Sequence, residues 1–322
     1  MKPSQPTSPT ETPQSALWER RSSVQCNKHF EGVKRQCGDC HDPCGFRLKS
    51  AFDEVGFACL PGALPSAAEF SGVYELFDTL FGADADPAVL NHLAREAGLW
   101  SCHTGNAAAY SAAPVGFKDR RVRSDKSNKA YLQFTPEFGY FLRGLRKGSY
   151  EASLGLRQLC AKLDELAQHA ERVFRNSIRS LVRSFPHEFP SADFDGPMSV
   201  LVKVLAYYPG EEWATPRHFD KSLLTLVLNA SDLEADKLRV GPFEAAGAGK
   251  LMLAPPRQVQ SRTMPGTGVL FPGMMWKKLG VDFLKPSPHA VLPVNDASVR
   301  YSAIAFLIAP DLDTSDMMTN IM

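Results

Sequence analysis

The sequence predicts a mainly β protein whose helices come first, and two observations carry that prediction. After Pro190 the chain contains six short β-like runs separated by Gly and Pro, which is typical of a sandwich or barrel rather than a βαβ sheet. Before Pro190, apolar residues recur at helical spacing, most clearly over residues 151–184. We therefore expect an α-rich N-terminal region followed by an all-β second half.

Four regions are expected along the chain. Residues 1–24 are rich in Pro, Ser and Thr, which predicts a disordered tail. Residues 25–45 form a Cys/His-rich segment. Residues 46–195 are the α-rich region, which we expect to pack on the core, and residues 196–322 are the β core.

Three helices are expected before the β half. The first ends near Gly56 and leads into a short strand that contains Phe57. The second follows Ser66, a plausible N-cap, and the third covers residues 151–184 and stops before Pro186. The second helix should bury the apolar residues at helical spacing, which are Phe70, Val73, Phe77 and Leu80.

The bulk composition is that of an ordinary globular chain. It has 322 residues, of which 44% are hydrophobic and 22% charged, and a formal net charge of +1. A chain this close to neutral provides no strong electrostatic field to attract nucleic acid or acidic membranes. The sequence contains no run of about 18 apolar residues, so we expect no membrane span. Seven cysteines without a visible export signal indicate a reducing, cytoplasmic location.

A possible metal site is spread over the β half. His218 and Asp220 are separated by one residue, so strand alternation would point both side chains to the same side. His289 would complete a set of two imidazoles and one carboxylate, which suits non-haem Fe(II) with open positions for other ligands. Each residue alone has an ordinary explanation, because HxD triplets occur by chance and a His at a strand start is usually a core residue.

A possible carboxylate site begins at Arg300, with ten residues between it and His289. Alternation places Arg300 and Ser302 on one face of an apolar strand, where a guanidinium and a hydroxyl can hold a carboxylate. An Arg in so apolar a strand is costly to bury without an anion, although a buried polar pair is the plainer explanation. The order HxD, distant His and RxS is more specific than any of its parts.

This order resembles the isopenicillin N synthase-like branch of the 2-oxoglutarate and Fe(II)-dependent dioxygenases. The resemblance covers about residues 46–310 and includes the stretches AFDEVGFACLPGALP, VLAYYPG and TGVLFPGMMWKKLG. It implies a double-stranded β-helix, or jelly-roll, core. It also implies that the iron ligands are His218, Asp220 and His289. The residues that it implies for the distal carboxylate of 2-oxoglutarate are Arg300 and Ser302.

Tyr208 matches the tyrosine that commonly reaches the co-substrate or the substrate in this branch. Its ordinary alternative is a strand-end aromatic residue that packs in the core. Ala206 stands where the branch usually has Asn, which weakens that co-substrate contact.

The resemblance implies Fe(II), 2-oxoglutarate and O2 as cofactors, with ascorbate as a reductant in vitro. The implied reaction is hydroxylation, desaturation or oxidative cyclisation at a C–H bond of a small metabolite, as in natural-product biosynthesis. A protein or peptide hydroxylase of the same mechanism is the alternative.

Three residues near the implied site are candidates for substrate contact. They are Arg217, Lys221 and Trp276, and the next residues after Trp276 are two further lysines. Basic residues facing inward would favour a carboxylated or amino-acid-derived substrate. Alternation, however, points Arg217 away from His218. The oligomeric state stays open.

The Cys/His-rich segment suggests a second metal site. Its C-x-x-H and C-x-x-C pairs are spaced like the two halves of a structural zinc site. The alternatives are free thiols, or a zinc-binding interaction module joined to a catalytically inactive jelly roll. The stretch CGDCH also fits c-type haem attachment, which would require export. The candidate ligands are Cys26, His29, Cys37, Cys40 and Cys44.

Overall fold

The computed structural model describes residues 45–60, 67–81, 100–101, 116–118, 129–135, 150–189, 199–210, 214–230, 238–240, 243–246, 250–253, 257–258, 268–291 and 299–309. The chain from Asp42 to Met322 forms one compact unit. The predicted tail and the five candidate zinc ligands lie outside the described residues, so those predictions stay predictions.

Three of the four described helices lie where periodicity predicts them. They are α2 (Gly45–Val55), α3 (Ala67–Phe81) and α7 (Tyr150–Ser184), and the fourth is the short α8 (Met275–Lys278). Helix α2 ends because Gly56 adopts φ 85°, and its N–H donates to the carbonyl of Phe52 at 3.1 Å. None of the described helices combines the length and apolarity that crossing a bilayer would require.

The largest sheet has eight strands in the order β1-β12-β7-β14-β5-β4-β3-β2. All its neighbours pair antiparallel except β2 and β3. Its strands are β1 (Ala58–Leu60), β2 (Trp100–Ser101), β3 (Gly116–Lys118), β4 (Lys129–Phe134), β5 (Ser199–Tyr207), β7 (Leu224–Ala230), β12 (Gly268–Pro272) and β14 (Arg300–Ile308).

A second, four-stranded sheet has the order β11-β8-β13-β6, and β9 pairs with β10 alone. These strands are β6 (Thr215–His218), β8 (Leu238–Val240), β9 (Phe243–Ala246), β10 (Lys250–Leu253), β11 (Arg257–Gln258) and β13 (His289–Val291). Each of the six β-like runs in the sequence corresponds to a strand, so the mainly antiparallel β architecture is confirmed.

The eight-stranded sheet takes strands from both sides of residue 195. Strand β4 pairs with β5 along its whole length, from Lys129 opposite Tyr207 to Phe134 opposite Val202. The predicted region 46–195 therefore contributes strands to the core as well as the helices that cover it.

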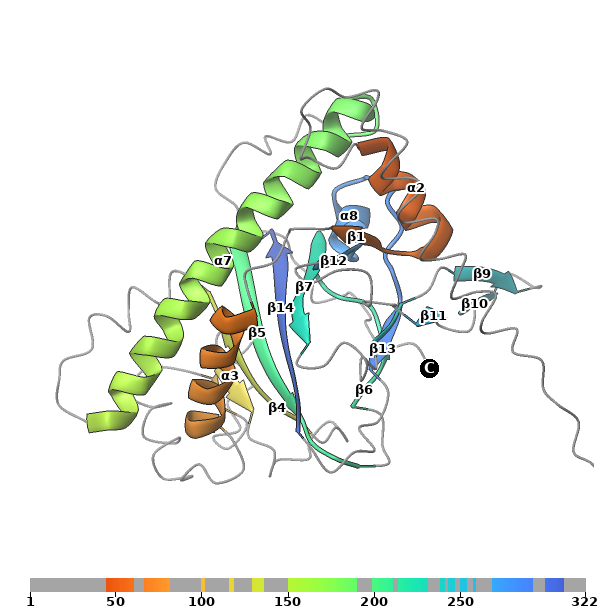
Figure 1. Cartoon of the computed structure of the whole chain (residues 1–322). Helices are drawn as coiled ribbons and strands as arrows, with labels where there is room; N and C mark the ends of the chain where they lie inside the picture. Colours follow the sequence, from red (N-terminus) through yellow and green to blue (C-terminus); the bar gives the residue numbers. More distant parts are fainter. Residues whose placement is uncertain are drawn as a thin grey trace, which may run out of the picture. The chain divides into compact units, whose positions relative to one another are not determined.

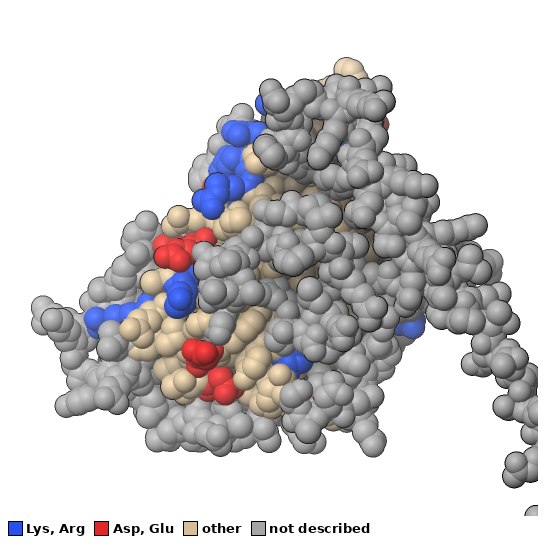
Figure 2. Space-filling model, viewed as in Figure 1, with Lys and Arg blue, Asp and Glu red and all other residues tan. Residues whose placement is uncertain are grey.

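Helices cover one face of this sheet, which we call the outer face (Figure 1). The apolar stripe of α7 packs there against β5, β7 and β14. This outer cluster includes Leu163, Phe174, Ile178, Val204, Leu226, Trp276 and Ala305. Basic and acidic side chains alternate on the solvent side of these helices (Figure 2), in keeping with the nearly neutral net charge.

The inner face of the eight-stranded sheet looks toward the four-stranded sheet. A smaller inner cluster contains residues from both sheets, as expected for a jelly roll. It consists of Tyr131, Leu205, Tyr207, Ala214, Leu238, Val240, Val269, Phe271 and Val291. The candidate site lies beside this cluster.

Candidate metal centre

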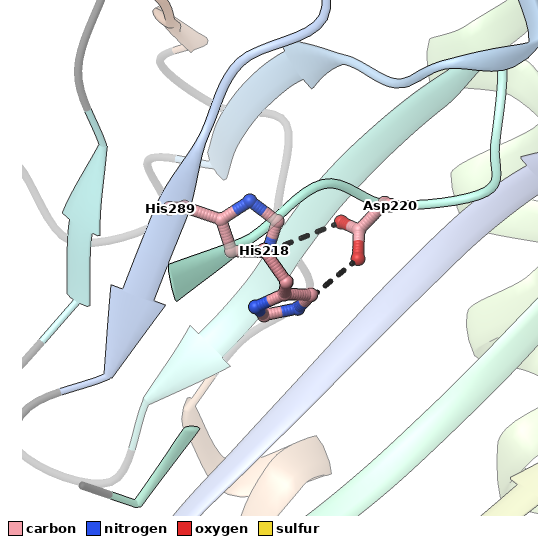
Figure 3. A group of neighbouring side chains, drawn as sticks. All are labelled: His218, Asp220 and His289. Carbon is pink, nitrogen blue, oxygen red and sulfur yellow. Dashed lines mark ion pairs between the residues drawn. The ribbon is translucent and has the colours of Figure 1, made fainter. Parts of the chain in front are cut away.

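Two imidazoles and one carboxylate converge at the end of the four-stranded sheet (Figure 3). Ligand atoms of His218, Asp220 and His289 all lie within 4.8 Å of one another. Nε2 of His218 is 3.5 Å from Oδ1 of Asp220, and Nε2 of His289 is 3.4 Å from Oδ2. The three side chains are 22%, 10% and 7% exposed, so the group is largely shielded from solvent.

The two histidines come from neighbouring strands. His218 is the last residue of β6, His289 is the first residue of β13, and the two are partners in the antiparallel register. Their ring centroids are therefore only 4.2 Å apart. A sequence separation of 71 positions is closed by one strand pairing.

Asp220 reaches the same point by a different route from the one predicted. Strand β6 ends at His218, so Asp220 lies in the bend that follows and not in the strand itself. Side chains hold it there, because the hydroxyl of Thr225 donates to Oδ2 at 2.8 Å and that of Ser222 lies 3.0 Å from the Thr225 hydroxyl. One carboxylate oxygen is thus fixed by hydrogen bonding, which orients the other.

The backbone at Gly273 clamps this bend. The N–H groups of residues 273–275 donate to the carbonyl oxygens of Leu223, Asp220 and Ser222 at 2.9–3.0 Å. A Cβ at Gly273 would lie 2.3 Å from the Ser222 carbonyl oxygen and 2.9 Å from that of Asp220. Glycine is therefore required for this close approach.

Electrostatics in this group favour positive charge beside the Asp220 carboxylate. Burial alone would raise the pKa of Asp220, but His289 and His218 outweigh it and hold this pKa well below its usual range. Burial would lower the pKa of His289, and the Asp220 carboxylate instead raises it above 6.5. Nδ1 of His289 lies 3.2 Å from the Ser287 carbonyl, so an N–H there would leave Nε2 to bind a metal.

Arg300 and Ser302 lie on the inner face of β14, as alternation predicts. Arg300 is opposite Tyr207 and Ser302 is opposite Leu205, and both partners belong to the inner cluster. The two side chains are 6% and 3% exposed. Cζ of Arg300 is 5.4 Å from the centre of the Tyr207 ring.

The inner cluster connects the basic side chain to the metal ligands. Tyr207 contacts Arg300 at one end of the cluster, and at the other end the ring of Phe271 lies 4.8 Å from that of His289. A buried guanidinium and a possible metal site therefore border one apolar interior.

Solved structures share this architecture, although no family model and no curated protein matches the chain. The structure of the dioxygenase for auxin oxidation in rice matches with a TM-score of 0.53 and 17% identity, covering 83% of this chain and 78% of that one. The structure of full-length Neurospora crassa T7H in complex with alpha-KG and 5-formyluracil matches with a TM-score of 0.54 and 14% identity. The match covers 82% of this chain and 78% of that one. The chain therefore shares the fold of these two proteins. The isopenicillin N synthase-like branch stays a prediction.

Within this fold, Tyr208 does not share the face of Arg300. It is buried and belongs to the outer cluster, and its role toward the co-substrate stays a prediction. Its neighbour Tyr207 lies on the inner face. Sequence reasoning did not single out Tyr207, because the two tyrosines are adjacent at the end of β5 and only the register with β14 distinguishes them.

The three substrate candidates do not gather at the metal ligands. Trp276 is fully buried in the outer cluster and packs edge-on against Phe189, with ring centroids 5.7 Å apart. Lys221 is exposed, as are Lys277 and Lys278 on α8. Arg217 is half-buried on β6, adjacent in the strand to His218 and hence directed to the other face.

Proposed function

We propose that the chain is a non-haem Fe(II)- and 2-oxoglutarate-dependent dioxygenase that oxidises a C–H bond of a small metabolite. The observation that carries this proposal is the convergence of His218, Asp220 and His289 within 4.8 Å, on a fold shared with 2OG-Fe(II) oxygenases. This donor set suits Fe(II) and leaves coordination positions for other ligands. Thr225 and Ser287 orient the ligands from outside.

Arg300 and Ser302 would hold the distal carboxylate of 2-oxoglutarate. A guanidinium binds a carboxylate through charge-assisted hydrogen bonds, which gain strength in a site shielded from water. Iron, with 2-oxoglutarate and O2, supplies the oxidising chemistry. The residues of the chain bind and orient these groups, and the inner cluster excludes water from the space between them.

Several finer features belong to this proposal. They are membership of the isopenicillin N synthase-like branch, a cytoplasmic location and a role in natural-product biosynthesis. The substrate is a small molecule, and the outcome is hydroxylation, desaturation or oxidative cyclisation.

Anaerobic titration of the Fe(II) protein with 2-oxoglutarate, followed by visible absorption, tests the proposal. Wild type should develop a charge-transfer band that is lost in Asp220→Ala and needs more 2-oxoglutarate in Arg300→Ala. Lys278→Ala, an exposed lysine on α8, is the matched control and should behave as wild type.

Failure to develop a band at any concentration of 2-oxoglutarate would contradict the proposal. Zinc as the bound metal, lost in Cys40→Ser and accompanied by no 2-oxoglutarate turnover, would instead support the zinc-binding module on an inactive jelly roll.

A further inference from the structure

A second buried cation lies on the inner face, in the same row of the sheet as Arg300. Lys129 of β4 is the register partner of Tyr207, and Tyr207 is in turn the partner of Arg300. Residues directly opposite one another in antiparallel strands present their side chains to the same face. Strands are spaced by about 4.8 Å, so the Cα atoms of the two basic residues are roughly 10 Å apart.

Lys129 is held in place rather than extended into solvent. Lys129 is 8% exposed, and its Nζ donates a hydrogen bond to Oγ1 of Thr215 at 3.2 Å. Lysine is among the residues that proteins bury least often, because its ammonium loses its hydration. Thr215 begins β6, so this hydrogen bond brings the ammonium to the strand that carries His218.

The position of Thr215 sets the distance from Lys129 to the metal ligands. Thr215 precedes His218 by three residues, which corresponds to about 10 Å along a strand. A carboxylate held at Lys129 would therefore leave the body of a small molecule between β4 and the His218 end of β6.

The described inner-face residues around Lys129 include aromatic and polar side chains as well as Leu205. Tyr131 and Tyr207 belong to the inner cluster, and Nζ of Lys203 lies 4.0 Å above the Tyr131 ring. Gln133 is the register partner of Lys203 and is 4% exposed. This part of the face thus combines positive charge and hydrogen-bonding groups with aromatic surface.

We propose that Lys129 binds a carboxylate of the substrate, and that the substrate is a small organic acid with an apolar or aromatic body. The inference rests on the proposed function, in which Arg300 serves the co-substrate. Each carboxylate then has its own buried cation, with the Tyr207 ring between the two. This replaces Arg217, Lys221 and Trp276 as the candidate contacts for a carboxylated substrate.

Calorimetric binding to the anaerobic Fe(II) protein saturated with 2-oxoglutarate tests the inference. The probes are acetate, hexanoate and phenylacetate, each compared with its neutral amide. At least one acid should bind wild type about 10- to 100-fold more tightly than its amide, the range of a charge-assisted hydrogen bond. Lys129→Met should abolish this preference, Lys129→Arg should keep most of it, and Lys221→Met, an exposed neighbour of the metal ligands, should keep all of it.

The outcomes separate this inference from the proposed function. A wild type without the charge-transfer band would overturn both. A normal band, together with no acid preferred over its amide or with an undiminished preference in Lys129→Met, would overturn this inference alone. So would a weaker 2-oxoglutarate response in Lys129→Met, because it would assign Lys129 to the co-substrate.

A second variant covers the case in which Lys129→Met does not fold. Thr215→Val keeps the shape of the side chain and removes the hydroxyl that holds the ammonium. It should reduce the preference for the acid several-fold, and an unchanged preference in this variant would contradict the inference.

Discussion

The outer and inner faces of the eight-stranded sheet are made by the same strands and differ in kind. On β14, Arg300 and Ser302 face inward, whereas Ala303 and Ala305 join the outer cluster. At the end of β5, Tyr207 joins the inner cluster, and Tyr208, which follows the strand, joins the outer cluster. The alternation of a strand thus lets one segment stabilise the fold and line the site, and a shift of one residue would exchange the two roles.

The chemical difference between the faces is large. The outer cluster is built from buried apolar side chains of α7, α3 and the strands. Buried polar residues gather on the inner face and around the metal ligands, and they include Lys129, Gln133, Thr225, His289, Arg300 and Ser302. Changes to the outer face should therefore alter stability, and changes to the inner face should alter ligand binding.

The largest effect should come from a metal ligand. Asp220→Ala should lower iron affinity by more than about 100-fold, because even outer partners of metal ligands are worth 10- to 100-fold. Iron content after anaerobic reconstitution measures this, and the free energy of unfolding of the metal-free protein should stay within about 1–2 kcal/mol of wild type. Retention of one iron per chain would contradict the assignment of Asp220.

The matching change on the outer face is Phe174→Ala in α7. Phe174 is fully buried, so its loss should lower the free energy of unfolding by about 3–5 kcal/mol. Denaturant unfolding measures this, with the exposed Gln168→Ala of the same helix as control. The iron affinity of the folded fraction should be unchanged. A lower iron affinity would show that the two faces are not independent.

The expected effect of Thr225→Val on iron affinity is smaller than that of Asp220→Ala. It removes the hydrogen bond to Oδ2 of Asp220 at nearly constant volume, and iron affinity should fall about 10- to 100-fold. Thr225→Ser, which keeps the hydroxyl, should recover most of the affinity. Equal loss in both variants would mean that packing, and not the hydrogen bond, holds the carboxylate.

The two adjacent tyrosines give the sharpest comparison of the faces. Tyr207→Phe should raise the Kd for 2-oxoglutarate by up to about 10-fold, the range of one hydrogen bond, whereas Tyr208→Phe should leave it unchanged. Titration of the charge-transfer band measures both. The opposite result would restore Tyr208 as the co-substrate residue that the resemblance implies.

The smallest expected effect is on pH dependence. The pKa of His289 is raised by Asp220, so this pair stabilises the metal-free fold fully below pH 6.5 and loses that contribution as pH rises through the raised pKa. Iron binding needs unprotonated His289, so iron affinity should rise over the same range. As pH rises, the free energy of unfolding of the metal-free protein should therefore fall while the iron affinity rises. A change of both quantities in the same direction would contradict this coupling.

Much of the fold and of the possible metal site could be predicted because the signals are local. The apolar stripe of α7 and the alternation at Arg300 and Ser302 are readable within a few residues. The order of His218, Asp220 and His289 adds a long spacing that is improbable by chance. These residues come together in the structure.

Other features depend on strand register, which no short stretch encodes. Tyr207 and Tyr208 are adjacent, and only the register shows which one faces Arg300. Lys129 lies within the region predicted to be α-rich, and its pairing with β5 places it on the inner face. Trp276 belongs to the stretch TGVLFPGMMWKKLG, which carries part of the resemblance, yet its position in α8 places it in the outer cluster. Sequence alone could not decide the register, because Lys129 and Arg300 are 78 and 93 positions away from their shared partner Tyr207.

The place of β14 in the sheet has a consequence for biosynthesis. It is the last described strand in the chain, yet it lies between β7 and β5 in the sheet order. A ribosome must therefore release the segment to about Ile308 before the two halves of the sheet can join. Until then the neighbouring edges of β5 and β7 stay open to mispairing, and a nascent chain stalled before Arg300 would be a natural client for chaperones.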